Sequence, residues 1–181
     1  MKKIFFLLIV MTMVFQLHAQ FTKATLQATG LTCAMCSNAI NKALQKVPFV
    51  ESVKSDIKNS AFSIVFKEKE IVDIDVLKNA VEDAGFSIGS LQLTGIFSNL
   101  AIANDKHVQI GTEEFHFLNV NSQSLEGERT LRVVDKSFVT AKEFKKISTA
   151  TKMSCLQTGK AASCCIQDGV PSNTRIYHVT I

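Results

Sequence analysis

The order of hydrophobic periodicities between residues 21 and 93 constrains the fold more than any other feature of this chain. Six segments follow one another, with apolar residues alternating with polar ones at 24–29, 53–58, 61–66 and 87–93, and recurring at helical spacing at 36–47 and 74–84. Alternation indicates a strand with one buried face, and the longer spacing indicates an amphipathic helix. The order strand–helix–strand–strand–helix–strand predicts a ferredoxin-like α+β fold, with two helices over one face of an antiparallel sheet.

From about residue 94 the pattern changes to one dominated by strands. We expect strands at 96–103, 107–110, 113–120, 130–134 and 175–181. Thr140 followed by Glu143 is a capping box, and Phe144 and Ile147 supply an apolar stripe behind it, so one helix should interrupt the strands. These features predict a small, mostly-β C-terminal domain over 94–181, with a barrel of the oligonucleotide-binding type as one option.

The first 19 residues have the composition of a targeting segment. Lys2 and Lys3 precede an apolar run at 4–15, and Ala19 follows as a small residue at the expected cleavage position. This pattern is typical of a secretory signal peptide, and the run is too short to span a membrane. We therefore expect an exported, periplasmic protein that begins near Gln20 and has no membrane span. The predicted organisation is a signal peptide (1–19), a first domain (21–93) and a second domain (94–181).

Composition excludes several classes of protein. Hydrophobic residues make up 46% of the 181 residues and charged residues 20%, which are ordinary values for a folded protein and exclude a disordered chain. The net charge is +4 with no basic cluster, so we expect no nucleic-acid partner. The five cysteines are the unusual feature, because an odd number cannot all pair within one chain.

Cys33 and Cys36 lie three residues apart at the predicted start of the first helix. Both sulfur atoms can approach one ion there, and the positive end of the helix stabilises thiolates. Two thiolates suit Cu(I), whereas Zn(II) prefers four ligands. The same spacing also occurs in thiol–disulfide catalysts and in structural disulfides, so the spacing alone leaves these alternatives open.

The first domain resembles the heavy-metal-associated domain family, which includes copper chaperones, the N-terminal parts of metal-transporting P-type ATPases and periplasmic mercury-binding proteins. The resemblance rests on the loop 30–36, on the strand before it and on the segment 80–86 that closes the second helix. It implies that Cys33 and Cys36 are the metal ligands and that Phe86 faces them. The implied cargo is Cu(I), with Hg(II) or Zn(II) as alternatives. Leu31 stands where the family usually has methionine.

Cys155, Cys164 and Cys165 form a second group of thiols. One option is a disulfide from Cys155 to Cys164 or Cys165, with one thiol left over. The other is a second soft-metal site of three thiolates, aided by Met153 or His178, that exchanges metal with the first site. His107, His116 and His178 lie on predicted strands, and each taken alone is expected to be a structural residue.

Together these features predict an exported metallochaperone that binds and transfers a soft metal, copper first and mercury second, and that is not an enzyme. The expected partners are the metal ion and an acceptor such as a metal-transporting ATPase. The alternatives are a periplasmic thiol–disulfide oxidoreductase, a mercury-binding scavenger, and a module whose second domain docks to a transporter.

Overall fold

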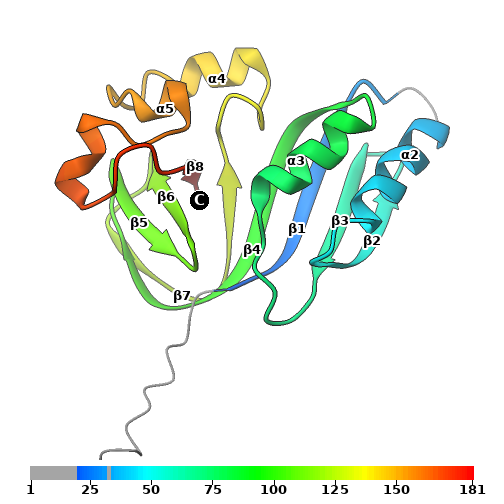
Figure 1. Cartoon of the computed structure of the whole chain (residues 1–181), viewed down its shortest axis with the longest axis horizontal. Helices are drawn as coiled ribbons and strands as arrows, with labels where there is room; N and C mark the ends of the chain where they lie inside the picture. The colour runs from blue at the N-terminus through cyan, green and yellow to red at the C-terminus, as the bar shows by residue number, and fades with distance from the viewer. Residues whose placement is uncertain (1–19, 32–33) are drawn as a thin grey trace, which may run out of the picture.

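The structure is a computed structural model that describes residues 20–31 and 34–181. The expected signal peptide (1–19) and Cys33 of the expected metal loop lie outside the described residues. Strands and helices follow one another along the rest of the chain (Figure 1). In order they are β1 (Gln20–Thr29), α2 (Ala34–Gln45), β2 (Val50–Asp56), β3 (Ala61–Phe66), α3 (Ile74–Asp83), β4 (Ser87–Ile102), β5 (Lys106–Ile110), β6 (Glu113–Phe117), β7 (Gln123–Val133), α4 (Ala141–Ile147), α5 (Cys155–Thr158), the 3-10 helix η1 (Ser163–Asp168) and β8 (Ile176–Thr180).

The N-terminal half has the predicted ferredoxin-like order β1–α2–β2–β3–α3–β4. β1 lies between β3 and β4 and is antiparallel to both, so Leu26 is opposite Phe62 on one side and Leu91 on the other. These three side chains are fully buried, as are Leu44 of α2 and Leu77 of α3. Figure 1 shows both helices on the same side of the sheet. The alternation in the sequence therefore identified the buried face correctly.

The ends of α3 show how local sequence fixes this half. Asp73 caps the N-terminus, its carboxylate accepting a hydrogen bond from the Val76 N–H at 3.1 Å. Gly85 follows the C-terminal end with φ +87°, a left-handed conformation that glycine adopts without a steric penalty. The next N–H, that of Phe86, then returns to the Val81 carbonyl at 3.1 Å. This cap brings the chain directly into β4.

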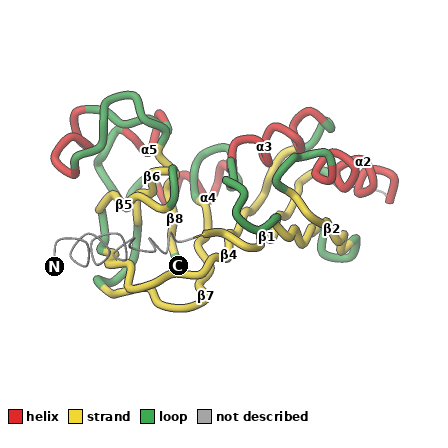
Figure 2. The backbone as a smooth tube through the Cα atoms, turned by 60° about the horizontal axis from the view of Figure 1, so that its bottom comes forward, coloured by secondary structure: helices red, strands yellow, loops and turns green. Residues whose placement is uncertain are grey.

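Within the described residues the eight strands form one open sheet in the order β2–β3–β1–β4–β7–β8–β6–β5. The C-terminal strands follow the ferredoxin-like part as expected, but the barrel considered for 94–181 does not form. β7 pairs with the free edge of β4 and so extends the existing sheet, which leaves β2 and β5 as its two edges. Figure 2 shows the strands of both halves in yellow.

β4 belongs to both halves of the sheet. The sequence predicts two strands here, at 87–93 and 96–103, whereas the structure has one strand of 16 residues. The strand continues because Gly95 has partners on both sides, Phe21 of β1 and Arg129 of β7. The expected boundary near residue 94 therefore falls inside a strand. Whether the two parts fold as separate domains stays a prediction.

The two halves also share one hydrophobic core. The ring of Phe21 on β1 lies 5.6 Å, centroid to centroid, from that of Phe115 on β6. Phe115 in turn lies 5.7 Å from Tyr177 on β8. All three rings are buried. Apolar contact is therefore continuous from the first strand of the N-terminal half to the last strand of the chain.

The C-terminal half carries α4, α5 and η1 above its strands (Figure 1). α4 begins where the capping box predicts, with the Thr140 hydroxyl accepting from the Glu143 N–H at 3.3 Å. The Glu143 carboxylate pairs with Arg132 of β7 at 2.6 Å, which ties the helix to the sheet. The sequence reasoning did not predict α5 or η1, the two short segments that carry the C-terminal cysteines.

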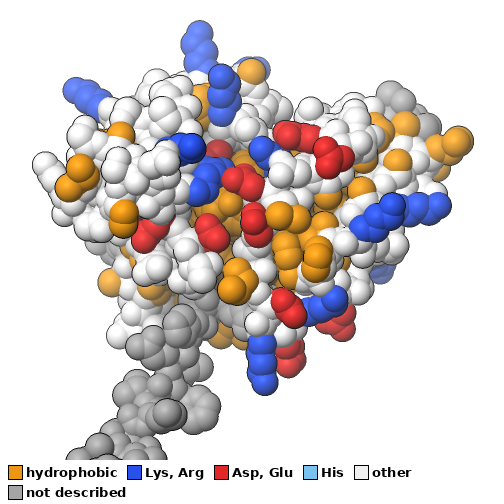
Figure 3. All heavy atoms as spheres, in the orientation of Figure 1, with side chains coloured by type: hydrophobic (Ala, Val, Ile, Leu, Met, Phe, Trp, Pro, Cys, Tyr) orange, Lys and Arg blue, Asp and Glu red, His pale blue; other side chains and the backbone are white. Residues whose placement is uncertain are grey.

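The described part of the chain contains no helix that is both long enough and apolar enough to cross a bilayer. On the face drawn in Figure 3, basic and acidic side chains are intermixed.

Candidate metal-binding sites

The expected metal loop lies between the end of β1 and the start of α2. Gly30 has φ +81° and turns the chain out of the strand. α2 begins at Ala34, so Cys36 lies in its first turn, where it is half-buried. The first turn of this helix has no acidic residue, so nothing in it opposes the positive end of the helix dipole. Cys33, the other expected ligand, lies outside the described residues.

Of three other residues near the expected metal loop, one has an exposed side chain and two pack against the core. The Met35 side chain is 83% exposed at the start of α2. Leu31 and Phe86 are partly buried and pack against the main core. Leu31 therefore retains the apolar packing expected of the methionine it replaces, and Met35 marks this end of the helix as accessible to another molecule.

A second group of metal-ligating side chains lies in the C-terminal half, on three neighbouring strands. His107 on β5 is the register partner of His116 on β6, and His116 is the partner of His178 on β8. Residues directly opposite one another project from the same face of a sheet. The rings of His107 and His116 stack at 4.3 Å between centroids, and those of His116 and His178 meet edge to face at 5.1 Å. The three rings form one row, which we call the histidine row.

Each ring of the histidine row has a carboxylate at one of its nitrogen atoms. Asp168 lies 2.8 Å from Nδ1 of His107, Asp105 lies 3.0 Å from Nε2 of His116, and Asp135 lies 2.6 Å from Nδ1 of His178. All three imidazole side chains are fully buried. Burial is the main cause that lowers the pKa of His116 to about 4, and charge on His178 and His107 adds to it. His116 is therefore neutral at neutral pH, the form that binds metals.

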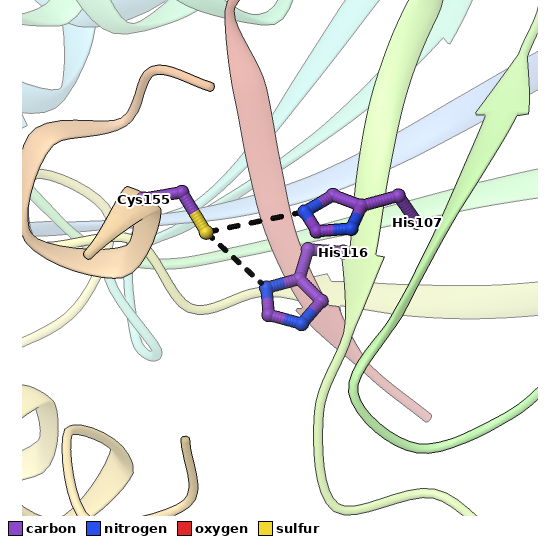
Figure 4. Close-up of side chains that lie close together, drawn as sticks. All are labelled: His107, His116 and Cys155. Carbon is purple, nitrogen blue, oxygen red and sulfur yellow. Dashed lines mark hydrogen bonds between the residues drawn. The ribbon is translucent and has the colours of Figure 1, made fainter. Parts of the chain in front are cut away.

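The second nitrogen of every ring points to one sulfur atom, that of Cys155 at the start of α5. The distances from Sγ are 3.9 Å to Nε2 of His107, 3.7 Å to Nδ1 of His116 and 3.5 Å to Nε2 of His178. Figure 4 shows two of these rings converging on the thiol. Cys155 is fully buried, and burial raises the pKa of its thiol above the ordinary value.

The other two cysteines complete a group of three sulfur atoms. The ligand atoms of Cys155, Cys164 and Cys165 all lie within 4.8 Å of one another, so the fold brings together the three thiols that the sequence grouped. Cys165 is buried and Cys164 is half-buried. Burial raises the pKa of Cys164, but hydrogen bonds from Ser154 and its other neighbours outweigh this and lower it to about 7. Met153 packs beside this group.

Cys36 and the three C-terminal cysteines do not meet. α2, which carries Cys36, and α5, which carries Cys155, lie toward opposite ends of the molecule in both ribbon views (Figures 1 and 2). The expectation that metal passes directly between the two groups within one chain therefore has no support in this arrangement.

Comparison with known proteins accounts for the N-terminal half. Residues 25–87 match the family model of the heavy-metal-associated domain. The mercuric transport protein periplasmic component of Serratia marcescens is 30% identical over 86 residues, which make up 48% of this chain and 93% of that protein. The chain belongs to the heavy-metal-associated domain family.

The chain is also similar to parts of larger proteins. The probable copper-transporting ATPase HMA5 of Arabidopsis thaliana is 25% identical over 124 residues, which are 68% of this chain but only 12% of the ATPase. Among solved structures, a copper binding domain from HMA7, a P-type ATPase, is 33% identical, and the match covers 37% of this chain and 92% of that domain with a TM-score of 0.33. The chain thus spans a small part of the ATPases that it resembles.

The match to the heavy-metal-associated domain model ends at residue 87, the first residue of β4. The histidine row and the three C-terminal cysteines all lie beyond it.

The sequence analysis treated His107 and His116 as separate structural residues, although the sequence contains a signal for their pairing. Gly111 and Thr112 form a two-residue turn between β5 and β6, and such a turn fixes the register that places these histidines opposite each other.

Proposed function

We propose that this protein is an exported carrier that binds one soft metal ion, Cu(I) in the first place, between Cys33 and Cys36. The observation that carries the proposal is the position of Cys36 in the first turn of α2, inside a domain that belongs to the heavy-metal-associated family. A thiolate there is stabilised by the free N–H groups of the helix, and two thiolates satisfy the low coordination number that Cu(I) accepts. The role is that of a carrier rather than a catalyst.

The surroundings of Cys36 favour transfer as well as binding. Met35 beside it is 83% exposed, so an acceptor can approach this end of the helix. A site with two ligands leaves room for an incoming thiolate, and metal can then pass to the acceptor by stepwise ligand exchange. The acceptor that this chemistry fits is another protein with exposed paired cysteines, such as a metal-transporting ATPase, the class of protein in which related domains occur.

Mercury is the second candidate for the cargo. The relative from Serratia marcescens is a periplasmic component of mercuric transport, and its name supports both the alternative metal and the proposed export. Hg(II), like Cu(I), is a soft ion for which thiolates are the preferred ligands. A scavenger of this kind would use the same two cysteines.

Anaerobic titration of the reduced protein with Cu(I), against a competing chelator, tests the proposal. We expect Cys33→Ser and Cys36→Ser each to remove one tight Cu(I) equivalent, because one remaining thiolate cannot hold the ion. The matched control is Met35→Leu, which keeps the apolar surface and should keep that equivalent. Unchanged affinity in either serine variant would show that the loop is not the site. A parallel titration with Hg(II) ranks the two metals.

Export is tested separately by sequencing the N-terminus of the protein recovered from the periplasm. We expect it to begin at or near Gln20. Recovery of the protein with Met1 intact, or only from the cytoplasm, would contradict the proposed location.

A further inference from the structure

Around the sulfur of Cys155, the histidine row presents more hydrogen-bond acceptors than there are hydrogen atoms to satisfy them. A neutral imidazole has one N–H and one nitrogen with a lone pair. When the N–H of each ring is donated to its carboxylate, the lone pairs of His107, His116 and His178 all point toward the sulfur of Cys155. That thiol has a single hydrogen and can satisfy only one of them. Buried acceptors are rarely left without a partner, so this arrangement needs a positive centre between the four groups.

The carboxylates support the same conclusion independently. Metal-binding histidines typically donate their second nitrogen to a carboxylate, which fixes the orientation of the ring and makes it a better ligand. Here every ring has such a partner, supplied by three different segments: Asp105 between β4 and β5, Asp135 after β7, and Asp168 at the end of η1. Three carboxylate–histidine pairs directed at the sulfur of one cysteine exceed what the packing of a sheet requires.

A catalytic cysteine fits the geometry poorly. A nucleophilic thiol needs one base and a path for the substrate, whereas Cys155 has three imidazoles and is fully buried.

The sulfur–nitrogen distances suit a tetrahedral ion. The ligand atoms of His107, His116 and Cys155 all lie within 4.8 Å of one another, and His178 adds a nitrogen 3.5 Å from the same sulfur. Typical Zn–S and Zn–N bond lengths at tetrahedral angles place sulfur and nitrogen about 3.6 Å apart. The sulfur–nitrogen distances around Cys155 are 3.5, 3.7 and 3.9 Å. Three imidazoles and one thiolate form a closed set of nitrogen and sulfur ligands, which favours a divalent ion of the zinc class over one that prefers oxygen.

We propose that His107, His116, His178 and Cys155 form a second, four-ligand site for a divalent cation of the zinc class. This site differs from the proposed two-thiol loop in its ligands, its burial and its place at the other end of the molecule. Because its ligands come from β5, β6, β8 and α5, the ion would hold the short helices on the sheet. Cys164 and Cys165 adjoin the site and are not among its four ligands.

Co(II) and Zn(II) are the probes for this site, used with the full protein carrying Cys33→Ser and Cys36→Ser. These two replacements remove both thiols of the loop 30–36. Metal binding by this variant therefore tests the second site independently of the proposed function. We expect one equivalent of Co(II) with the visible bands of tetrahedral coordination and a near-ultraviolet thiolate-to-cobalt band. Zn(II) should displace the cobalt and raise the melting temperature.

Further replacements in that background identify the ligands. Cys155→Ser should abolish the thiolate-to-cobalt band, and Cys164→Ser, its matched control, should leave the band and the stoichiometry unchanged. Asp105→Asn tests a positioning residue: its backbone has φ +60°, which asparagine also tolerates, so the fold should be kept. The variant should bind zinc about 10- to 100-fold more weakly, the usual effect of removing a carboxylate that orients a ligand.

Two results would overturn the proposal. One is the absence of Co(II) and Zn(II) binding in the loop-deficient protein whose circular dichroism shows it to be folded. The other is binding with different ligands: binding that is unchanged in Cys155→Ser, or binding that is lost in Cys164→Ser but unchanged in Asp105→Asn. The second pattern would point to a site made by the three thiols instead.

Discussion

Arg175 forms a two-point ion pair with Asp75, a residue 100 positions earlier in the chain. Its Nε lies 2.9 Å from Oδ2 of Asp75, and its Nη2 lies 3.2 Å from Oδ1. The same guanidinium reaches Asp135, the carboxylate that holds His178. Since Asp75 is on α3, this contact links the heavy-metal-associated domain to the histidine row in the C-terminal half.

We expect Asp75→Asn to lower the free energy of unfolding by about 1–2 kcal/mol at pH 7, because it leaves a half-buried guanidinium with one charged partner fewer. Burial raises the pKa of Asp75, but its hydrogen bond and charge interaction with Arg175 outweigh this and place the pKa below 3.8. A carboxyl group whose pKa is lower in the folded than in the unfolded state stabilises the protein when the pH is above the unfolded-state pKa. This contribution is lost as the pH falls through the folded-state pKa. The difference between wild type and variant should therefore shrink below pH 3.8.

Urea unfolding at a series of pH values measures this difference. Asp83→Asn is the matched control, because Asp83 is exposed at the C-terminal end of the same helix, where a negative charge is unfavourable. It should leave stability unchanged or slightly raised. A pH-independent loss in Asp75→Asn would show that the ion pair is not its cause.

The shared core predicts that the two halves unfold together. Tyr177 is the only tyrosine in the chain, which has no tryptophan, so intrinsic fluorescence reports on β8 alone. Leu26→Ala, a fully buried change in β1, should cost about 3 kcal/mol by leaving a cavity. We expect it to shift the Tyr177 transition and the circular dichroism transition in urea by the same amount. Ile57→Ala, at a position that is 61% exposed, should shift neither. An unchanged Tyr177 midpoint in Leu26→Ala would mean that the two halves fold as separate domains.

The sequence was sufficient for the N-terminal half because each of its elements buries a single face. The six expected segments correspond to β1, α2, β2, β3, α3 and β4, and both the capping box at Thr140 and the glycine at the end of α3 were recognised. Local periodicity and caps are properties of a few neighbouring residues, so a single sequence contains them.

The sequence was not sufficient where pairing is long-range. Thr94 and Gly95 resemble a break between strands, and only the pairing of β7 with the edge of β4 makes them part of one strand. The parallel pairing of His116 with His178 depends on two strands that are far apart in the chain, and no local signal specifies it. The second candidate site therefore became visible only with the sheet register, whereas the three C-terminal cysteines, of which it uses Cys155, could be grouped from the sequence.

Gly85 allows a test of the junction between α3 and β4. Its φ of +87° is strained for any residue with a side chain, although the space around its Cα is open. Gly85→Ala should therefore lower the free energy of unfolding by about 1 kcal/mol without any clash, and Gly85→Asn should cost less because asparagine tolerates this conformation. Thermal unfolding compares the two variants. Equal losses for alanine and asparagine would indicate that backbone conformation is not what matters here.

The three C-terminal cysteines should differ in their reactivity toward iodoacetamide. Cys155 and Cys165 are fully buried, whereas Cys164 is half-buried beside Ser154, whose hydroxyl lies 3.5 Å from its sulfur. In the reduced, metal-free protein we expect Cys164 to be alkylated first and the other two only as the segment opens. Peptide mapping by mass spectrometry distinguishes the three sites, and Cys36 serves as an internal reference in a different part of the fold.

Zinc should then change this pattern in a specific way. If Cys155 binds the ion with the histidine row, zinc should protect Cys155 even in mild denaturant, because opening α5 would require breaking a metal–sulfur bond. Cys164, which is not one of the four ligands, should remain reactive. Equal protection of all three thiols would favour a site made by the cysteines. A stable disulfide at Cys155 under every redox condition would instead assign this group a structural role.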